Sequence, residues 1–258
     1  MTSTTPPAHP PQLSTKMTEE EAHRIVRSST PIRTLDNVGM VAAVAVFPDK
    51  RRMATTSSDG ILRLWDLKRG IILNELEERG EGMGGIAISQ DGQLIASNIG
   101  HGGHVNAWHG DTGKPLIQAF IPHPRSRVSS MDFSSDGATL VTGSSDGTTQ
   151  VWNTATWQPQ GQPISLRNVY GGPDSVTCVR YSPSAKLLAI ATEGSIQIWN
   201  PSTMQRIADL AQRAISLVWT LDGTRIVSGP IPPYDSGIHR PGRRSAIGKS
   251  TPAIPSSP

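Results

Sequence analysis

The sequence is poor in cysteine, with Cys178 as its one thiol among 258 residues. A single cysteine excludes an intrachain disulfide, and with it the class of small secreted domains that disulfides hold together. No stretch has the length and apolarity of a membrane span or of the core of a signal peptide. We therefore predict an intracellular protein of a reducing compartment, the cytoplasm, with a nuclear location left open.

The chain also lacks a strong excess of charge of one sign. Lys and Arg number 24 and Asp and Glu number 21, which gives a formal net charge of +3. The segment after Gly229 holds four of the cations and one carboxylate, Asp235, and so accounts for the whole excess. The remainder of the chain is neutral and offers no basic face of the kind that binds phosphate backbones. We therefore expect no nucleic-acid partner.

No set of residues indicates catalysis or a bound metal. Ser, His and Asp are plentiful, but the carboxylates that stand out lie in turn positions. His101, His104 and His109 are close in sequence, yet no matching cysteines or carboxylates accompany them, as a zinc site would need. The glycine-rich run 100–103 opens no helix, unlike a phosphate-binding loop. We predict that the protein is not an enzyme and has no catalytic residues, cofactor or metal.

Four tryptophans recur at a nearly constant spacing. Trp65, Trp108, Trp152 and Trp199 are 43, 44 and 47 residues apart, and each ends a segment with three strand-like runs. A period of about 40–45 residues in a β-rich sequence is typical of the blades of a β-propeller. One blade cannot bury its apolar face alone, so we expect neighbouring repeats to pack against one another.

Each repeat has the turn signals of a small antiparallel sheet. Asp91-Gly92 and Asp136-Gly137 separate strand-like runs, and glycine tolerates the positive φ that tight hairpins need. Four short strands per period, without helical periodicity, predict an all-β protein of four-stranded blades. The full copies span Val41–Asp66, Gly84–His109, Val128–Asn153 and Val176–Asn200, and a partial fifth spans Ala214–Gly229. The predicted fourth strands lie between copies, at Ile71–Leu76, Pro115–Phe120 and Gln162–Leu166.

These features resemble the WD-repeat (WD40) family of β-propellers over roughly Ile32 to Gly229. Trp65-Asp66 is the dipeptide that names the family, and Trp152-Asn153 is a relaxed form of it. The resemblance implies a structural tetrad, in which a His, a Ser or Thr and a turn Asp hydrogen-bond with one another and with the Trp. The tetrad-like residues are His123, Thr142, Asp146 and Trp152 in the third copy, Thr55, Asp59 and Trp65 in the first, Ser97 and Trp108 in the second, and Trp199 in the fourth.

The resemblance also implies a function. Members of the family contact partners through the loops before the innermost strands, which here hold Met40, Arg127, Asp174, Ser175 and Arg213. We therefore predict a non-catalytic WD40-repeat scaffold that mediates protein–protein interactions and binds other proteins or peptides. We expect no nucleic acid, membrane or small molecule as a ligand. The alternative hypothesis is a truncated fragment of a larger WD40 protein with no stable independent function.

The repeats do not fill the chain, and their number does not close a ring. We predict a disordered Pro/Ser/Thr-rich N-terminus with a short helix over 1–30, the repeat region over 31–229, and a disordered, basic, Pro-rich tail over 230–258. Pro31–Leu35 is predicted to be an outer strand without a blade of its own. Four full blades and a partial fifth predict an open or incomplete propeller. Codons for Tyr234–Gly242 read one base earlier can encode a Trp-Asp strand, so a shifted reading frame in the tail is a further hypothesis.

Overall fold

The computed structural model describes residues 34–35, 39–77, 84–99, 103–120, 122–124, 126–229 and 249–252. The chain divides into two units, Met1–Asp36 and Asn37–Pro258, and every described strand belongs to the second. The predictions for 1–30 and for most of 230–258, including the shifted-frame segment, lie outside the described residues. In the part of the chain that is described, no helix has the length and apolarity that a membrane crossing requires.

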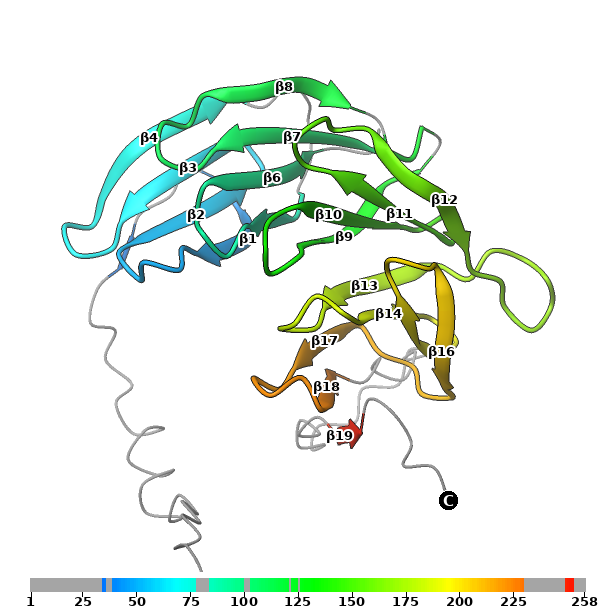
Figure 1. Cartoon of the computed structure of the whole chain (residues 1–258). Helices are drawn as coiled ribbons and strands as arrows, with labels where there is room; N and C mark the ends of the chain where they lie inside the picture. The colour runs from blue at the N-terminus through cyan, green and yellow to red at the C-terminus, as the bar shows by residue number, and fades with distance from the viewer. Residues whose placement is uncertain are drawn as a thin grey trace, which may run out of the picture. The chain divides into compact units, whose positions relative to one another are not determined.

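The described strands form five antiparallel sheets, each built from strands that follow one another in sequence (Figure 1). The first sheet contains β1 (Val41–Val46), β2 (Arg52–Ser57), β3 (Ile61–Asp66) and β4 (Ile71–Glu77). The second contains β5 (Ile86–Ile88), β6 (Leu94–Ile99), β7 (His104–His109) and β8 (Pro115–Phe120). The third contains β9 (Val128–Phe133), β10 (Thr139–Ser144), β11 (Thr148–Asn153) and β12 (Pro159–Ser165). The fourth contains β13 (Val176–Tyr181), β14 (Leu188–Thr192), β15 (Ile196–Asn200) and β16 (Gln205–Leu210), and the fifth contains β17 (Ser216–Trp219), β18 (Arg225–Gly229) and β19 (Lys249–Pro252).

The prediction of four four-stranded blades and a partial fifth is confirmed. The predicted strand Pro31–Leu35 is wrong at its described residues, because Thr34 and Leu35 lie in no strand. In the fifth sheet, the third strand is β19, whose backbone pairs with Arg225–Ser228 of β18. This pairing satisfies backbone N–H and C=O groups that the edge of β18 would otherwise leave open. A short stretch of the tail, which the sequence predicted to be disordered, therefore adds a third strand to the sheet that the fifth repeat begins.

Adjacent sheets meet through their first strands, with contacts from β1 to β5, β5 to β9, β9 to β13 and β13 to β17. One hydrophobic cluster fills each of the four junctions and takes residues from both sheets. Leu62 with Ile95 and Val141 with Ile190 are examples from the first and third junctions. The described sheets do not close into a ring, and Val44 and Val46 of β1 remain 55% and 54% exposed. Each sheet is thus stabilised mainly by its immediate neighbours.

The turn between the first and second strands of every sheet places one residue in the left-handed region of φ. Glycine adopts this conformation freely, whereas a residue with a Cβ is strained there by roughly 1 kcal/mol. The five residues are Lys50 (φ 55°), Gly92 (φ 72°), Gly137 (φ 68°), Ala185 (φ 56°) and Gly223 (φ 68°). The second, third and fifth sheets thus have an unstrained turn, and the first and fourth sheets do not.

We expect Lys50→Gly to raise the free energy of unfolding by up to about 1 kcal/mol, and Gly137→Ala to lower it by about 1 kcal/mol. Lys50 is exposed, and a Cβ added at Gly137 would have Ser89 Cβ as its nearest neighbour, at an ordinary contact distance of 3.8 Å. Both changes therefore report on backbone conformation rather than on packing. Urea unfolding of the two variants checks this, and a loss of stability in both would contradict it.

Candidate protein-interaction surface

The residue before the first strand of three sheets is held by the same backbone contact. The carbonyl oxygens of Met40, Arg127 and Ser175 each accept an N–H bond from the turn between the second and third strands of the same sheet. The donors are Ser58, Ser145 and Glu193, at 2.8, 3.3 and 3.2 Å. The backbone is therefore fixed at three equivalent positions, while Met40 and Arg127 are exposed and Ser175 is half-buried.

Arg213 lies at the corresponding end of the fifth sheet. Its Nε–H donates to the carbonyl oxygen of Glu193, so its exposed side chain bridges the fifth and fourth sheets. We call Met40, Arg127, Ser175 and Arg213 the rim. Among the residues that the structure describes, Arg127 and Arg213 form no ion pair with a carboxylate.

Asp174 does not belong to this exposed set, so the prediction that it lies on the contact surface is wrong. It is 6% exposed, and its Oδ2 accepts a hydrogen bond from Thr192 Oγ1 at 2.7 Å. The fourth copy has no histidine before its first strand, and Asp174 meets the hydroxyl of β14 instead. The Asp174 carboxylate therefore serves the interior of the fourth sheet.

The third sheet contains a continuous chain of hydrogen bonds from Trp152, which is buried, to Asp146, which is partly exposed. Trp152 Nε1–H donates to Thr142 Oγ1 at 3.0 Å, and Thr142 Oγ1 lies 3.1 Å from His123 Nε2. On the other side of the ring, His123 Nδ1 lies 2.8 Å from Thr148 Oγ1, which donates to Asp146 Oδ1 at 2.5 Å. Every donor has an acceptor when the neutral imidazole carries its proton on Nδ1. Burial lowers the pKa of His123, against the effect of Asp146, which favours this neutral form.

Thr148 is a member of this network that the sequence analysis missed. The direct distance from His123 Nδ1 to Asp146 Oδ2 is 3.7 Å, too long for a hydrogen bond, so the hydroxyl of Thr148 mediates the contact. A Ser or Thr two residues after the turn Asp is the sequence signal that could have found it. Thr148 N–H also donates to Asp146 Oδ1 at 2.9 Å, which fixes the turn.

The first sheet replaces the missing histidine with an arginine. Trp65 Nε1–H donates to Thr55 Oγ1 at 2.9 Å, as the tetrad implies. Asp59, however, pairs with Arg63 Nη2 at 2.8 Å, and Arg63 is only 3% exposed. The hydrogen bond from Arg63 is the largest cause that holds the pKa of Asp59 at about 2. Arg63 Nε also donates to Glu75 Oε1 at 2.8 Å, so this guanidinium is fully engaged in the fold.

The second and fourth sheets satisfy their tryptophans with other partners. Trp108 Nε1–H donates to Ser97 Oγ at 3.0 Å. In the fourth sheet, where Ala189 supplies no hydroxyl, Trp199 Nε1–H donates to Gln197 Oε1 at 3.1 Å. All four repeat tryptophans are thus hydrogen-bonded inside their own sheets. The tetrad-like residues are thus engaged in contacts within the blades.

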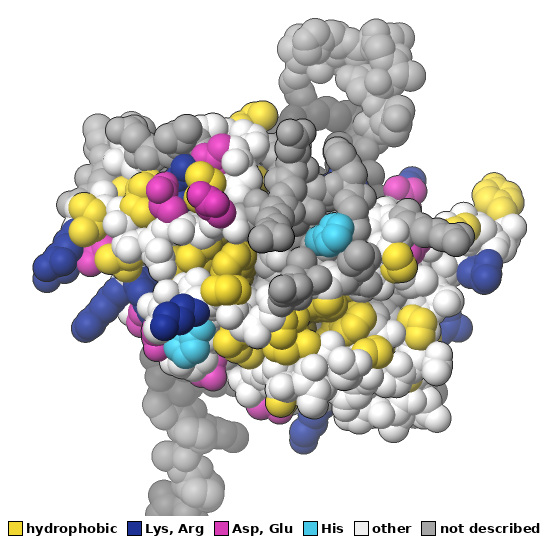
Figure 2. Space-filling view, turned by 90° about the horizontal axis from the view of Figure 1, so that it is seen from above, with side chains coloured by type: hydrophobic (Ala, Val, Ile, Leu, Met, Phe, Trp, Pro, Cys, Tyr) yellow, Lys and Arg dark blue, Asp and Glu magenta, His cyan; other side chains and the backbone are white. Residues whose placement is uncertain are grey.

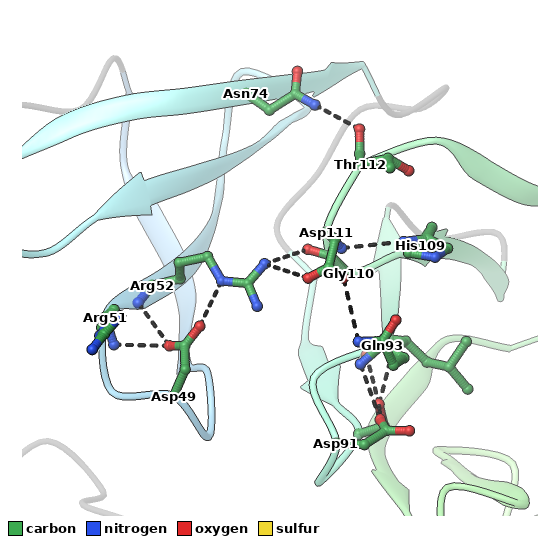
Figure 3. A network of polar contacts seen from close by, with 12 residues as sticks. Asp49, Arg51, Arg52, Asn74, Asp91, Gln93, His109, Gly110, Asp111 and Thr112 are labelled. Carbon is green, nitrogen blue, oxygen red and sulfur yellow. Dashed lines mark hydrogen bonds and ion pairs between the residues drawn. The ribbon is translucent and has the colours of Figure 1, made fainter.

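A polar network joins the first and second sheets at the end opposite to the rim (Figure 3). Arg52 pairs with Asp49 at 2.7 Å within the first sheet, and with Asp111 at 2.9 Å across the junction. It also donates to the carbonyl oxygen of Gly110 at 3.0 Å, and its guanidinium lies 4.3 Å from the centre of the Phe47 ring. Arg52 is therefore a contact between blades, and its Nε and Nη1 donors are engaged there.

Nothing in the described part of the chain assembles a metal or catalytic centre. No group of three or more His, Cys, Asp or Glu side chains there could hold a metal ion, and His101 lies outside the described residues. His109 Nδ1 accepts the backbone N–H of Asp111 at 3.2 Å. The segment 143–147 has the sequence pattern of a Gly-x-Ser-x-Gly nucleophile elbow, but it consists of the end of β10 and the hairpin turn to β11, and it opens no helix.

A half-buried carboxyl group, that of Asp132 in β9, connects the inner strands β9 and β13. Asp132 Oδ2 accepts the backbone N–H of Tyr181 at 2.8 Å. The Arg180 guanidinium donates to Ser130 Oγ at 3.2 Å and to the Met131 carbonyl oxygen at 3.3 Å. Burial raises the pKa of Asp132 to about 6, and the charge of Arg180 opposes this rise only in part. The junction of the third and fourth sheets therefore contains a carboxyl group whose pKa lies well above its ordinary value.

This raised pKa predicts a pH-dependent stability. Because folded Asp132 binds its proton more tightly than the unfolded chain does, its stabilising contribution is full below the ordinary pKa of 3.8 and is lost as the pH rises through about 6. The unfolding free energy of Asp132→Asn minus that of the unchanged chain should therefore rise by roughly 2–3 kcal/mol from about pH 4 to about pH 7. His123 contributes the opposite slope, but it is common to both proteins and cancels in the difference. Urea unfolding across this pH range checks the result, and a constant difference contradicts it.

Repeated four-stranded antiparallel sheets, each with a tryptophan hydrogen-bonded inside it, define a protein built from propeller-type blades. The family model described as "WD domain, G-beta repeat" matches residues 29–66, 114–153 and 164–200, so the chain carries WD40 repeats. The unmatched stretch between the first two matches holds the second copy, whose tetrad has Gly102 in place of the Asp.

Curated relatives are WD-repeat proteins. The chain is 31% identical over 132 residues to the guanine nucleotide-binding protein subunit beta of Arabidopsis thaliana, covering 48% of this chain and 35% of that protein. It is 32% identical over 123 residues to the small ribosomal subunit protein RACK1y of Oryza sativa subsp. japonica, covering 44% and 34%. It is 27% identical over 127 residues to the target of rapamycin complex subunit wat1 of Schizosaccharomyces pombe, covering 48% and 39%. The matches thus span well under half of the length of these relatives.

Proposed function

We propose that this chain is a non-catalytic WD40-repeat scaffold that binds other proteins or peptides through the rim. The observation that carries the proposal is the common backbone contact of Met40, Arg127 and Ser175. It gives three sheets a rigid position of the same kind, filled by an apolar, a cationic and a small polar side chain. Rigid positions with varied side chains suit the recognition of another protein's surface.

The charges of the rim favour a partner with acidic groups. Arg127 and Arg213 are exposed, and in the described residues the arginines that pair with carboxylates are Arg52, Arg63 and Arg206. The two rim cations are therefore open to carboxylates of a partner, which would steer the encounter and set its orientation.

Proteins, rather than nucleic acids, membranes or small molecules, are the partners that we propose. WD40 repeats are in general non-catalytic, and the three relatives are named as subunits or components of larger assemblies. On the face seen in Figure 2, Lys and Arg side chains are scattered along the margins and do not gather into a basic patch. We propose a cytoplasmic location, with the nucleus as the alternative. The comparisons do not favour the other hypothesis, a fragment without stable independent function.

A charge-reversal experiment tests this function. We expect the full chain with Arg127→Glu and Arg213→Glu to lose about tenfold or more of its affinity for proteins that co-purify with the unchanged chain. Arg51→Glu with Lys186→Glu is the matched control, because both residues are exposed and lie in turns at the opposite end of the sheets. Affinity is measured by surface plasmon resonance with each purified partner.

The control separates surface chemistry from net charge. Both double variants change the formal charge by the same amount, so an effect confined to the rim variant supports the proposal. Equal losses in the two variants would indicate nonspecific electrostatic association. Full affinity in both variants would remove the rim as the binding surface.

A further inference from the structure

The connection from β12 to β13 ends in a loop whose tip is almost fully exposed. Val169 is 92% exposed and Tyr170 is 94% exposed, and the loop projects beyond the ends of both strands in Figure 1. We propose that these two side chains form an anchor that inserts into an apolar pocket on a partner protein. The inference rests on the proposed function and adds to it a contact separate from the rim.

Hydrogen bonds to Asn168 hold the tip in one conformation. Its Oδ1 accepts the backbone N–H groups of Tyr170 at 3.0 Å and of Gly172 at 3.1 Å, and its Nδ2 donates to the Pro173 carbonyl oxygen at 3.2 Å. Asn168 N–H also donates to the Gly172 carbonyl oxygen at 2.9 Å, and Arg167 forms a β-bridge with Pro173. The loop is therefore organised before any partner arrives, which lowers the entropy lost on binding.

The tip has no packing role in the described part of the fold. A Cβ added at Gly171, where φ is 81°, would meet no atom within 4 Å. The backbone beside Tyr170 is thus surrounded by solvent rather than by the third or fourth sheet. The loop holds two apolar side chains in water, so burying them in a complex would stabilise that complex.

The two residue types suit an anchor. Tyrosine has two side-chain torsions and valine is restricted at its first, so both lose little conformational entropy when they are buried. Tyrosine is enriched among the residues that dominate binding energy at interfaces. The complementary pocket would have apolar walls and, at its base, a polar group that hydrogen-bonds the phenol.

The charge of the loop favours a protein over a lipid surface or a nucleic acid. Arg167 is the one cation from Leu166 to Asp174, and its Nη1 already donates to the Gly171 carbonyl oxygen at 2.9 Å. Anionic membranes and phosphate backbones are bound through clusters of cations. Two apolar side chains also bury too little surface to hold a protein on a bilayer.

Site-specific crosslinking of the full chain tests the anchor. The photoreactive residue p-benzoylphenylalanine replaces Tyr170 or, as a control, Leu221, which is 98% exposed in the turn between β17 and β18 at the opposite end of the sheets. We expect a protein adduct at position 170 and none at position 221. The captured protein is then purified, and its affinity is measured for the unchanged chain and for Tyr170→Ala, Tyr170→Phe and Asn168→Ala.

We expect Tyr170→Ala to weaken this binding about tenfold to a hundredfold, the usual result of truncating an aromatic anchor. Tyr170→Phe should lose less, because it keeps the ring. Asn168→Ala keeps the anchor but loses its support, so an intermediate loss is expected. The melting temperature of Tyr170→Ala should match that of the unchanged chain, since the side chain is exposed.

Several outcomes would overturn the anchor. One is an equal yield of adducts at positions 170 and 221, and another is unchanged affinity of Tyr170→Ala for the captured protein. A third is that Tyr170→Ala keeps its protein binding but loses binding to phosphatidylserine vesicles or to oligouridine. If the rim variant loses affinity for its partners while Tyr170→Ala does not, the anchor fails and the proposed function stands. If neither variant loses affinity, both fail.

Discussion

Thr142→Val is expected to lower the free energy of unfolding by about 3 kcal/mol. Thr142 is 0% exposed, and its hydroxyl joins Trp152 Nε1 to His123 Nε2. Valine keeps the shape of the side chain but leaves the indole N–H and the imidazole nitrogen buried without a partner. Each unsatisfied buried group costs about 1–3 kcal/mol, so the loss reflects both ends of the network.

Thr149 provides the matched control in the next strand. It is 1% exposed, and its Oγ1 is the buried side-chain oxygen that has no hydrogen-bond partner among the described residues. Thr149→Val removes an unsatisfied polar atom, so we expect it to be neutral or to stabilise the protein by roughly 1 kcal/mol. Urea unfolding followed by tryptophan fluorescence compares the variants. Equal losses at both positions would show that the hydrogen bonds of Thr142 are not the cause.

Leu140→Ala is the second large effect, with an expected loss of about 3–4 kcal/mol. Leu140 is 0% exposed and lies between Phe133 and Trp152 on the two neighbouring strands. It belongs to the hydrophobic cluster that joins the second and third sheets, so alanine leaves a cavity at a junction rather than within one sheet. Leu73→Ala in β4 is the control, because Leu73 is 48% exposed and its loss should cost under about 1 kcal/mol. A small effect at Leu140 would contradict the role of the junction.

The architecture was largely predictable, because its signal is local and periodic. The Trp spacing and the Asp-Gly turns report on strands and hairpins formed within a few residues, and Pro115–Phe120 is both the predicted strand and the bounds of β8. The third strand of the fifth sheet was not predictable in the same way. β19 pairs with β18 across about 20 residues of irregular composition, and no local pattern marks it.

The polar partners were the least predictable part of the candidate surface. Arg63 fills the place of a histidine in the first sheet, and Asp174 turns inward to Thr192 in the fourth. Both contacts depend on which side chain lies within reach of a buried group in the folded chain. The sequence pattern of the repeats does not contain that information. The positions of Met40, Arg127, Ser175 and Arg213 at one end of the sheets followed directly from strand order, but their exposure did not.

The placement of one hydrophobic cluster at each junction has a consequence for folding kinetics and amide exchange. Couplings that act only between neighbours make the sheets resemble a one-dimensional array, in which structure can nucleate at one sheet and propagate to the next. The second, third and fourth sheets are flanked on both sides, whereas the first and fifth each share one cluster. Backbone amides of β10 and β14 should therefore exchange with solvent most slowly, and protection should fall toward both ends of the array.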